Sequence, residues 1–188
     1  MRCCLKKEIR DSSLTRRLIG PKPTVLVTCI DSKGRANIIA IAACTVVSHE
    51  PAIYMVPVRY DRYSHDLIAE SKEFVINVPT ADLVEETEFC GTKSGRDVDK
   101  FAETGLVAVP ASLVRPPLIK ECPINIECKV IQSTKPGTHT LFFGEVVAAH
   151  VEEGLFPDGF NDYGRLPVIL SSYAEYLNVG SSIRRRRQ

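Results

Sequence analysis

Residues 59–65 combine two arginines, Arg59 and Arg62, with the hydroxyl of Ser64, where an extended segment gives way to a helical pattern. The first backbone N–H groups of a helix have no partner inside the helix. With guanidinium and hydroxyl groups beside them, they form a site that attracts a phosphate. The same residues also suit a solvated basic turn in which Ser64 caps the helix. The stretch therefore predicts either a phosphate site at Arg59 and Ser64 or an ordinary capped turn.

Three further polar residues stand where a ligand could meet them. Lys100 follows the polar segment 90–97 and could face a phosphate or the electron-rich edge of a ring. His139 opens an apolar segment, where an imidazole can hydrogen-bond a ligand or donate a proton near neutral pH. Asn37 lies in an apolar segment and needs partners for its amide. Each residue also has an ordinary alternative: a solvated lysine, a structurally bonded histidine and an asparagine bonded to backbone.

The sequence lacks self-contained catalytic machinery. Its seven cysteines include no CxxC pair, which argues against a disulfide framework and a zinc site, so we expect no metal. Cys44 and Cys90 are either buried apolar side chains or redox partners of a bound group. There is no P-loop and no GxSxG motif. A cofactor would therefore have to bring the chemistry.

The elements that must position these residues are mostly strands. Composition rich in β-branched residues predicts strands over 24–30, 36–42 with 44–47, 52–58, 73–78, 124–131 and 139–151. Short helices are expected over 64–71, over 80–86 and from 98. Turns at 31–34 and 136–137 would make hairpins. No GxGxxG follows a strand, which argues against a Rossmann fold. We expect a mainly β, antiparallel barrel of Greek-key type with short peripheral helices.

Length and charge limit the class of protein. The chain has 188 residues, which suits a single domain over 20–180 between an N-terminal extension, 1–19, and a basic tail, 181–188. Its 24 basic and 23 acidic residues leave a net charge of +1, without the broad basic surface of a nucleic-acid-binding protein. No apolar stretch is long enough to cross a membrane, and the first seven residues lack the apolar region typical of a signal peptide. We expect a cytoplasmic protein with no nucleic-acid or membrane partner.

Five segments carry a resemblance to a known family. They are GRANI at 34–38, RYDRYS at 59–64, EFVINVP at 73–79, CGTKSGRDVDKF at 90–101 and GTHTLFFGEV at 137–146. The fourth segment is long and unusual, and the order and spacing of all five agree. Over residues 20–180, the chain resembles the flavin reductase-like domain family, most closely its flavoredoxin branch.

This resemblance implies an FMN-binding split β-barrel that holds FMN noncovalently near the interface of a homodimer. The implied flavin contacts are Asn37, Ala43, Cys44, Thr45, Arg59, Ser64, Lys100, His139 and Tyr173. Arg59 and Ser64 would hold the phosphate. Lys100 and His139 would act in catalysis at the polar edge of the ring.

The leading functional hypothesis is an oxidoreductase that passes electrons from NADH or NADPH through FMN to a flavin, a metal chelate or a protein acceptor. An alternative is a noncatalytic FMN electron-transfer protein that depends on a partner reductase. A third hypothesis omits the flavin and treats the arginines and the tail as a nucleic-acid or partner surface, against which the near-neutral charge argues.

Overall fold

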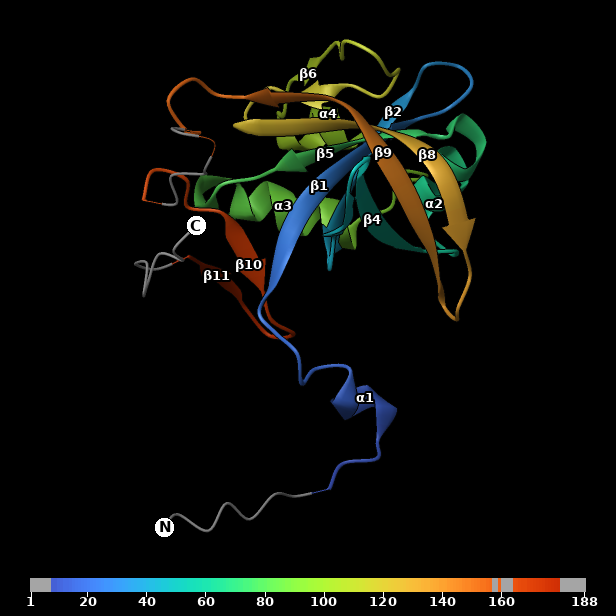
Figure 1. Ribbon diagram of the computed structural model, residues 1–188, viewed down its shortest axis with the longest axis vertical. Helices are drawn as coiled ribbons and strands as arrows, with labels where there is room; N and C mark the ends of the chain where they lie inside the picture. Colours follow the sequence, from blue (N-terminus) through green and yellow to red (C-terminus); the bar gives the residue numbers. More distant parts are fainter. Residues whose placement is uncertain (1–7, 157–158, 160–163, 180–188) are drawn as a thin grey trace.

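The computed structural model describes residues 8–156, 159 and 164–179; the expected basic tail, 181–188, lies outside them. The main sheet contains β1 (Lys22–Ile30), β2 (Ala36–Ala42), β3 (Thr45–His49), β4 (Ala52–Arg59), β5 (Glu73–Val78), β8 (Ile124–Thr134), β9 (His139–Val151), β10 (Ile169–Ser171) and β11 (Tyr176–Asn178). The other elements are α1 (Ser12–Thr15), α2 (Tyr63–Ser71), the 3-10 turn η1 (Ala81–Leu83), α3 (Val84–Thr92), α4 (Lys100–Thr104), β6 (Ala108–Val109) and β7 (Leu118–Ile119). The expected antiparallel, mainly β architecture is confirmed (Figure 1).

Antiparallel pairing runs in the order β11, β10, β1, β5, β8, β9, β4, β3, with β2 also paired to β1. Both predicted hairpins form, β1 with β2 and β8 with β9. In the first hairpin turn, Gly34 adopts a φ of 85° that L side chains rarely take. The Asp31 carboxylate accepts the backbone N–H groups of Lys33 and Arg35 in the same turn.

The chain changes sheet partner at Ala43, whose φ of 100° is unusual for a residue with a side chain. Before it, β2 pairs with β1; after it, β3 pairs with β4. Within the described residues, no ladder joins β2 to β4. The barrel is therefore split between these two strands.

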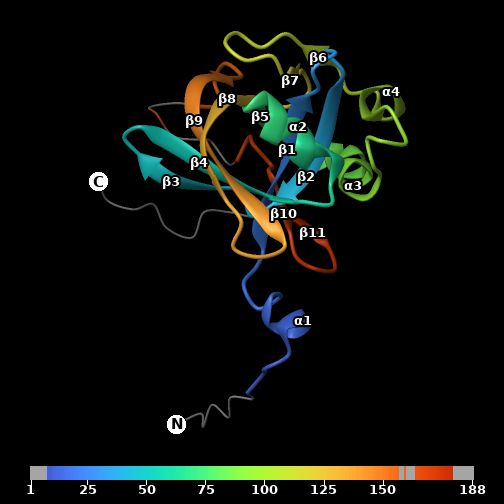
Figure 2. The same cartoon turned by 90° about the vertical axis from the view of Figure 1, so that its right-hand side faces the viewer.

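One face of helix α2 packs against the core of the barrel. Leu67 and Ile68 pack with Phe74 and Phe142 in the main hydrophobic core. Gly144 lies directly against Phe74: a Cβ on it would stand 2.4 Å from the ring. The core therefore requires glycine at this position of β9. On the opposite side of the molecule from the projecting β3–β4 hairpin, α3 and α4 lie beside β2 (Figure 2).

Two helix boundaries differ from the sequence prediction. Arg62, rather than Ser64, occupies the N-cap position of α2, so Ser64 lies inside the first turn and the predicted cap is wrong. The helix expected over 80–86 is instead η1 followed by α3, which continues to Thr92. Gly91 of α3 lies against Ala40 of β2, so that a Cβ at this position would touch the Ala40 side chain at 3.4 Å. Glycine at this position lets the helix pack closely on the strand.

A buried carboxylate holds the segment 106–123 on the face of the sheet opposite the barrel core. Glu127 is fully buried and accepts the N–H groups of Ser112, Leu113 and Val114 at 2.6–3.1 Å. It also bonds His150 Nε2 at 2.7 Å. Burial alone would raise the pKa of Glu127, but these hydrogen bonds outweigh it and the pKa is lowered.

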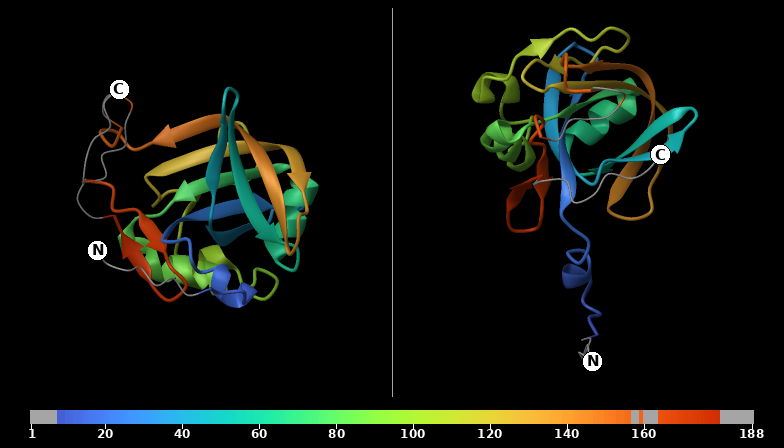
Figure 3. Two further views of the ribbon diagram at one scale, coloured as in Figure 1. Left: turned by 60° about the horizontal axis from the view of Figure 1, so that its bottom comes forward. Right: turned by 60° about the vertical axis from the view of Figure 1, so that its left-hand side comes forward.

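The N-terminal segment with α1 stands clear of the barrel (Figure 3). The guanidinium groups of Arg16 and Arg17 lie 4.8 and 4.4 Å from the centre of the Tyr173 ring, between β10 and β11. This cation–π contact ties the segment to the β10–β11 hairpin. Among the described residues, no helix has the length and apolar character needed to span a membrane.

Candidate functional site

Two adjoining cavities lie along β2. The first, of about 110 Å³, is lined by Asn37, Ile39, Asp61, Arg62, Tyr63, Ser64, Cys90, Gly91, Lys93, Ser94, Gly95 and Lys100. The second, of about 160 Å³, is lined by Ile39, Ala40, Ile41, Ala42, Pro57, Arg59, Arg62, Gly91 and His139. They share Ile39, Arg62 and Gly91. The second cavity opens at the split between β2 and β4, because side chains of both strands line it.

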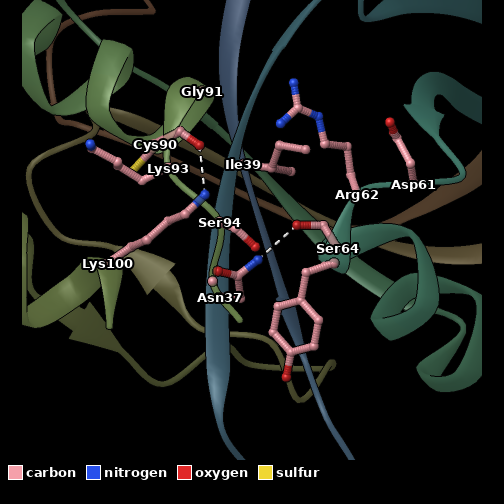
Figure 4. A pocket seen from close by; sticks show the side chains of 12 residues that line it. Asn37, Ile39, Asp61, Arg62, Ser64, Cys90, Gly91, Lys93, Ser94 and Lys100 are labelled. Carbon is pink, nitrogen blue, oxygen red and sulfur yellow. Dashed lines mark hydrogen bonds between the residues drawn. The ribbon is translucent and has the colours of Figure 1, made fainter. Parts of the chain in front are cut away.

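A buried hydrogen bond crosses the first cavity. Asn37 Nδ2 donates to Ser64 Oγ at 2.7 Å, and only 3% and 1% of the two residues are exposed. The Ser64 hydroxyl also lies within hydrogen-bonding reach of the buried Cys29 thiol, and it could turn its O–H toward a ligand instead. Asn37 Oδ1 is buried and has no hydrogen-bond partner within the described structure. Figure 4 shows this pair in the middle of the cavity, with Lys100 on one side and Arg62 on the other.

Lys100 is a buried cation at the wall of the first cavity. It is the first residue of α4, which Asp99 caps by accepting two backbone N–H groups. Lys100 Nζ donates to the backbone oxygens of Ile38 at 2.7 Å and Cys90 at 2.6 Å. An ammonium has three N–H groups, so one remains for a ligand. Burial lowers the pKa of Lys100; the neighbouring Cys90 and Cys29 only partly offset that effect, and the charge of Arg62 adds to it.

The sequence prediction missed Lys93 and Ser94, and it placed Arg62 in the basic turn but not among the flavin contacts; the three add two cations and a hydroxyl to the first cavity. Arg62 is the N-cap of α2 with extended backbone and makes no side-chain cap bond, so the N-terminal end of the helix adjoins this cavity. The cation and hydroxyl content of RYDRYS and TKSGR was the available signal. Such a donor set, with the positive end of a helix, suits a phosphate.

The second cavity joins an apolar wall to three basic residues, Arg59, Arg62 and His139. Arg59 and His139 are directly opposite each other in the β4–β9 ladder. Arg59 Nη2 pairs with Asp61 Oδ2 at 2.5 Å, and His139 Nδ1 bonds Thr138 Oγ1 at 2.9 Å. Burial, followed by the charge of Arg59, lowers the pKa of His139. The cavity thus suits an apolar ring with a polar edge.

Four expected contacts line neither cavity. Ala43, Cys44 and Thr45 lie at the exit of β2, where Cys44 packs into the core and Thr45 is exposed. Burial raises the pKa of the Cys44 thiol to about 12. Tyr173 is 56% exposed beneath Arg16 and Arg17. Their roles toward a flavin stay predictions. Asn37, Ser64 and Lys100 do come together, as do Arg59 and His139.

The thiol of Cys90 lines the first cavity, but its surroundings disfavour a redox role. Burial raises the pKa of Cys90 to about 11, and the nearby Lys100 only partly offsets that effect. A thiol with so high a pKa stays protonated near neutral pH and is a poor nucleophile. Within the described residues, no group of three or more histidine, cysteine, aspartate or glutamate side chains could hold a metal ion.

Comparison with known proteins places this geometry in a family. The family model described as a flavin reductase like domain matches residues 17–168. The flavoredoxin of Desulfovibrio vulgaris (Miyazaki F) superposes with a TM-score of 0.86 at 30% identity, over 96% of this chain and 97% of that one. An uncharacterized protein of Archaeoglobus fulgidus is 35% identical over 80% of this chain and 84% of its own. The reductase component of the FADH2-dependent resorcinol hydroxylase of Rhizobium sp. is 27% identical, over 76% and 78% respectively.

These findings confirm the resemblance drawn from the five sequence segments. The fold is the split barrel of the flavin reductase-like proteins, with its antiparallel sheet and short peripheral helices. The family match spans the strands and helices that line both cavities. The chain therefore belongs to the flavin reductase like domain family.

Proposed function

We propose that this chain binds FMN noncovalently along the two cavities and relays electrons from NADH or NADPH to a flavin, a metal chelate or a protein. The phosphate would lie in the first cavity, and the ring against the apolar wall of the second, so Lys100 would face the phosphate and Arg59 the ring, the reverse of the roles that the family resemblance implies. The observation that carries the proposal is the first cavity, where Ser64, Lys100 and Arg62 supply phosphate donors beside a buried, unpaired Asn37 oxygen.

The residues present fit FMN in kind. The Asn37 Oδ1 atom is an acceptor without a partner in the described structure, and the ribityl chain of FMN carries hydroxyl donors. Gly95 keeps the adjacent wall free of a side chain, since a Cβ there would stand 2.0 Å from that oxygen. The cations match the phosphate charge. Family membership supports the same cofactor.

Once bound, FMN supplies two-electron chemistry with a nicotinamide and one- or two-electron chemistry with an acceptor. The chain's own residues bind and tune it. Lys100 and Arg62 place positive charge where the ligand carries negative charge. His139, whose pKa is lowered, is neutral at pH 7 and holds its place through Thr138. It can therefore donate or accept a single hydrogen bond at the ring edge.

A homodimer would complete the site. Ligand sites for molecules of this size occupy about 300–1,000 Å³, whereas the two cavities measure about 110 and 160 Å³. A second copy packed over the split between β2 and β4 would supply a further wall. This assembly forms part of the proposal.

The phosphate assignment is tested by titrating the protein with FMN and with riboflavin, which lacks the phosphate. We expect wild-type protein to bind FMN more tightly, and Ser64→Ala to reduce FMN affinity about tenfold, the loss expected for one charge-assisted hydrogen bond. Riboflavin affinity should fall less, because that ligand loses only the support that Ser64 gives to Asn37. Ser133→Ala, at an exposed position of β8, is the matched control. Equal losses for both ligands would place Ser64 away from the phosphate.

The electron donor is tested separately. A relative named as a reductase component supports a nicotinamide-dependent reductase over a noncatalytic FMN carrier. FMN-loaded protein is mixed anaerobically with NADH or NADPH while the visible flavin band is followed. Bleaching by either donor is expected. If neither donor bleaches the band, the reductase proposal fails and the carrier alternative replaces it.

A further inference from the structure

The first cavity has two walls that come from distant parts of the chain. One wall is the segment 61–64 leading into α2, and the other is the segment 93–95 between α3 and α4. Arg96 directly follows the second wall, yet its side chain does not line the cavity. It reaches across to the first wall instead.

Arg96 contacts the opposite wall at three points. Its Nη2 donates to Asp66 Oδ2 at 2.9 Å, and its Nη1 donates to the backbone oxygen of Asp61 at 3.3 Å. The guanidinium also lies over the Tyr63 ring, 5.2 Å from its centre. We refer to these contacts as the Arg96 bridge. All three partners belong to α2 or the turn before it.

Two other contacts hold the segment 93–95 on its inner side. Arg35 Nη2 donates to the Gly95 oxygen at 3.0 Å, and the Gly95 backbone lies against the Asn37 side chain. Both anchors lie on the β2 side of the segment. Toward α2, the Gly95 backbone packs against the Tyr63 ring, and the Arg96 bridge adds the hydrogen bonds and the ion pair that join the segment to the opposite wall. The separation of the two walls thus depends in part on the bridge.

We infer that Arg96 is a positioning residue that holds the two walls of the first cavity at the spacing a phosphate requires and slows release of the ligand. The inference rests on the proposed function for the identity of the ligand. The guanidinium acts through Asp66, Asp61 and Tyr63 and does not contact the ligand itself. This role involves only the segment 93–96 and α2, and the strands of the barrel keep their positions.

Asp66 separates this role from simple electrostatics. Asp66→Ala removes a negative charge near an anion site, together with the contact of Asp66 Oδ1 with His65 Nδ1 at 3.1 Å, and electrostatic attraction alone predicts tighter FMN binding. Loss of the bridge predicts weaker binding and faster release. Arg96→Gln weakens binding under either explanation, so the Asp66 variant decides between them. Because both variants break one bridge, their combined effect should be smaller than the sum of the two.

The experiment measures FMN dissociation rates and affinities for Arg96→Gln, Asp66→Ala and the double variant. We expect each single variant to release FMN roughly five- to tenfold faster, the scale of one exposed ion pair with a cation–π contact. Arg96→Lys should restore only part of the loss, since an ammonium lacks the planar fork. Arg115→Gln is the matched control, because Arg115 joins another loop to Glu73 and to the oxygen of Ser71 at the C-terminal end of α2, away from the cavity. It should release FMN at the wild-type rate.

A second readout needs no ligand. Amide hydrogen exchange over residues 93–99 should be faster in Arg96→Gln and Asp66→Ala than in wild-type or Arg115→Gln protein. Unchanged exchange overturns the bridge whether or not FMN binds. Tighter FMN binding by Asp66→Ala overturns it in favour of electrostatics. Failure of wild-type protein to bind FMN would refute the proposed function, while the exchange result still decides the bridge.

Discussion

At the scale of single residues, the first cavity depends on the absence of a side chain at Gly95. A Cβ there would stand 2.0 Å from Asn37 Oδ1, 2.7 Å from its Cγ and 3.0 Å from the Tyr63 ring. Because real Cβ atoms do not approach so closely, either Asn37 or the segment itself must move. The glycine therefore serves the site rather than a turn.

We expect Gly95→Ala to lose about 1–3 kcal/mol of unfolding free energy, as overpacked sites do, and to bind FMN more weakly. Gly137→Ala is the control, because nothing lies within 4 Å of a Cβ at that hairpin position. Chemical denaturation and FMN titration measure both effects. If Gly95→Ala is as stable as wild type and binds FMN as tightly, the Asn37 side chain can move aside without cost to the fold or the site.

The lowered pKa of His139 also has a consequence at this scale. Burial and Arg59 lower it from the ordinary 6.5, so the unfolded chain binds this proton more readily than the folded one. As the pH falls through 6.5 and below, the folded protein loses the stability that this difference represents. His139→Gln removes the difference. The variant should therefore lose less unfolding free energy than wild type between pH 8 and pH 5 in denaturant titrations; an equal loss would contradict the assignment.

At the scale of elements, local patterns predicted the hairpins well. The turn at 31–34 and the turn at 136–137 each join strands adjacent in sequence, so residue type and short spacing were sufficient. By contrast, β10 and β11 have three residues each, and β10 pairs with β1 from far away in the chain. Such short strands are held by their neighbours and carry little pattern of their own.

The candidate site was predictable only where local sequence patterns marked its residues. Ser64 and Lys100 stood out because a hydroxyl and a cation follow segment boundaries. Their meeting with Asn37 depends on α2 and the 93–95 segment folding over β2, which no local spacing encodes. Ser64 was also misplaced as a cap. The helix begins one residue earlier, and the hydroxyl receives a bond from Asn37 instead.

Glu127 gives the element-scale prediction, because it anchors the segment 112–114 to β8. Glu127→Gln keeps the shape but loses the charge that accepts three backbone N–H groups and His150. We expect a loss of about 2–4 kcal/mol in unfolding free energy at pH 7. Since the folded pKa of Glu127 lies below the ordinary 4.5, the wild-type advantage is present above 4.5 and disappears as the pH falls through the folded pKa.

Urea titrations at pH 7 and at pH 3 or below test this dependence. Glu152→Gln, an exposed carboxylate just beyond β9, is the control and should match wild type at both values. A difference between wild type and Glu127→Gln that stays constant with pH would mean that the shape of the side chain matters and its charge does not.

At the scale of the whole molecule, the β3–β4 hairpin projects from the barrel, and β3 forms one edge of the sheet (Figure 2). β3 is the last strand of the sheet order, and it carries no charged residue apart from a terminal histidine. A bulge at Val47 leaves Val46 and Val47 exposed by 42% and 48%. Natural edge strands usually carry lysine or proline to prevent pairing with another chain. The surface of β3 is therefore suited to contact with a second copy.

Val47→Lys places such a charge on the edge and tests the proposed homodimer. We expect wild-type protein to sediment as a dimer and Val47→Lys as a monomer at the same concentration. FMN affinity should fall with it, because the second copy supplies a wall that cavities of about 110 and 160 Å³ lack. Val107→Lys adds the same charge at a residue 45% exposed outside the hairpin, so it controls for net charge. If Val47→Lys remains a dimer, the interface lies elsewhere on the molecule. If wild-type protein is a monomer that binds FMN tightly, one chain is sufficient to complete the site.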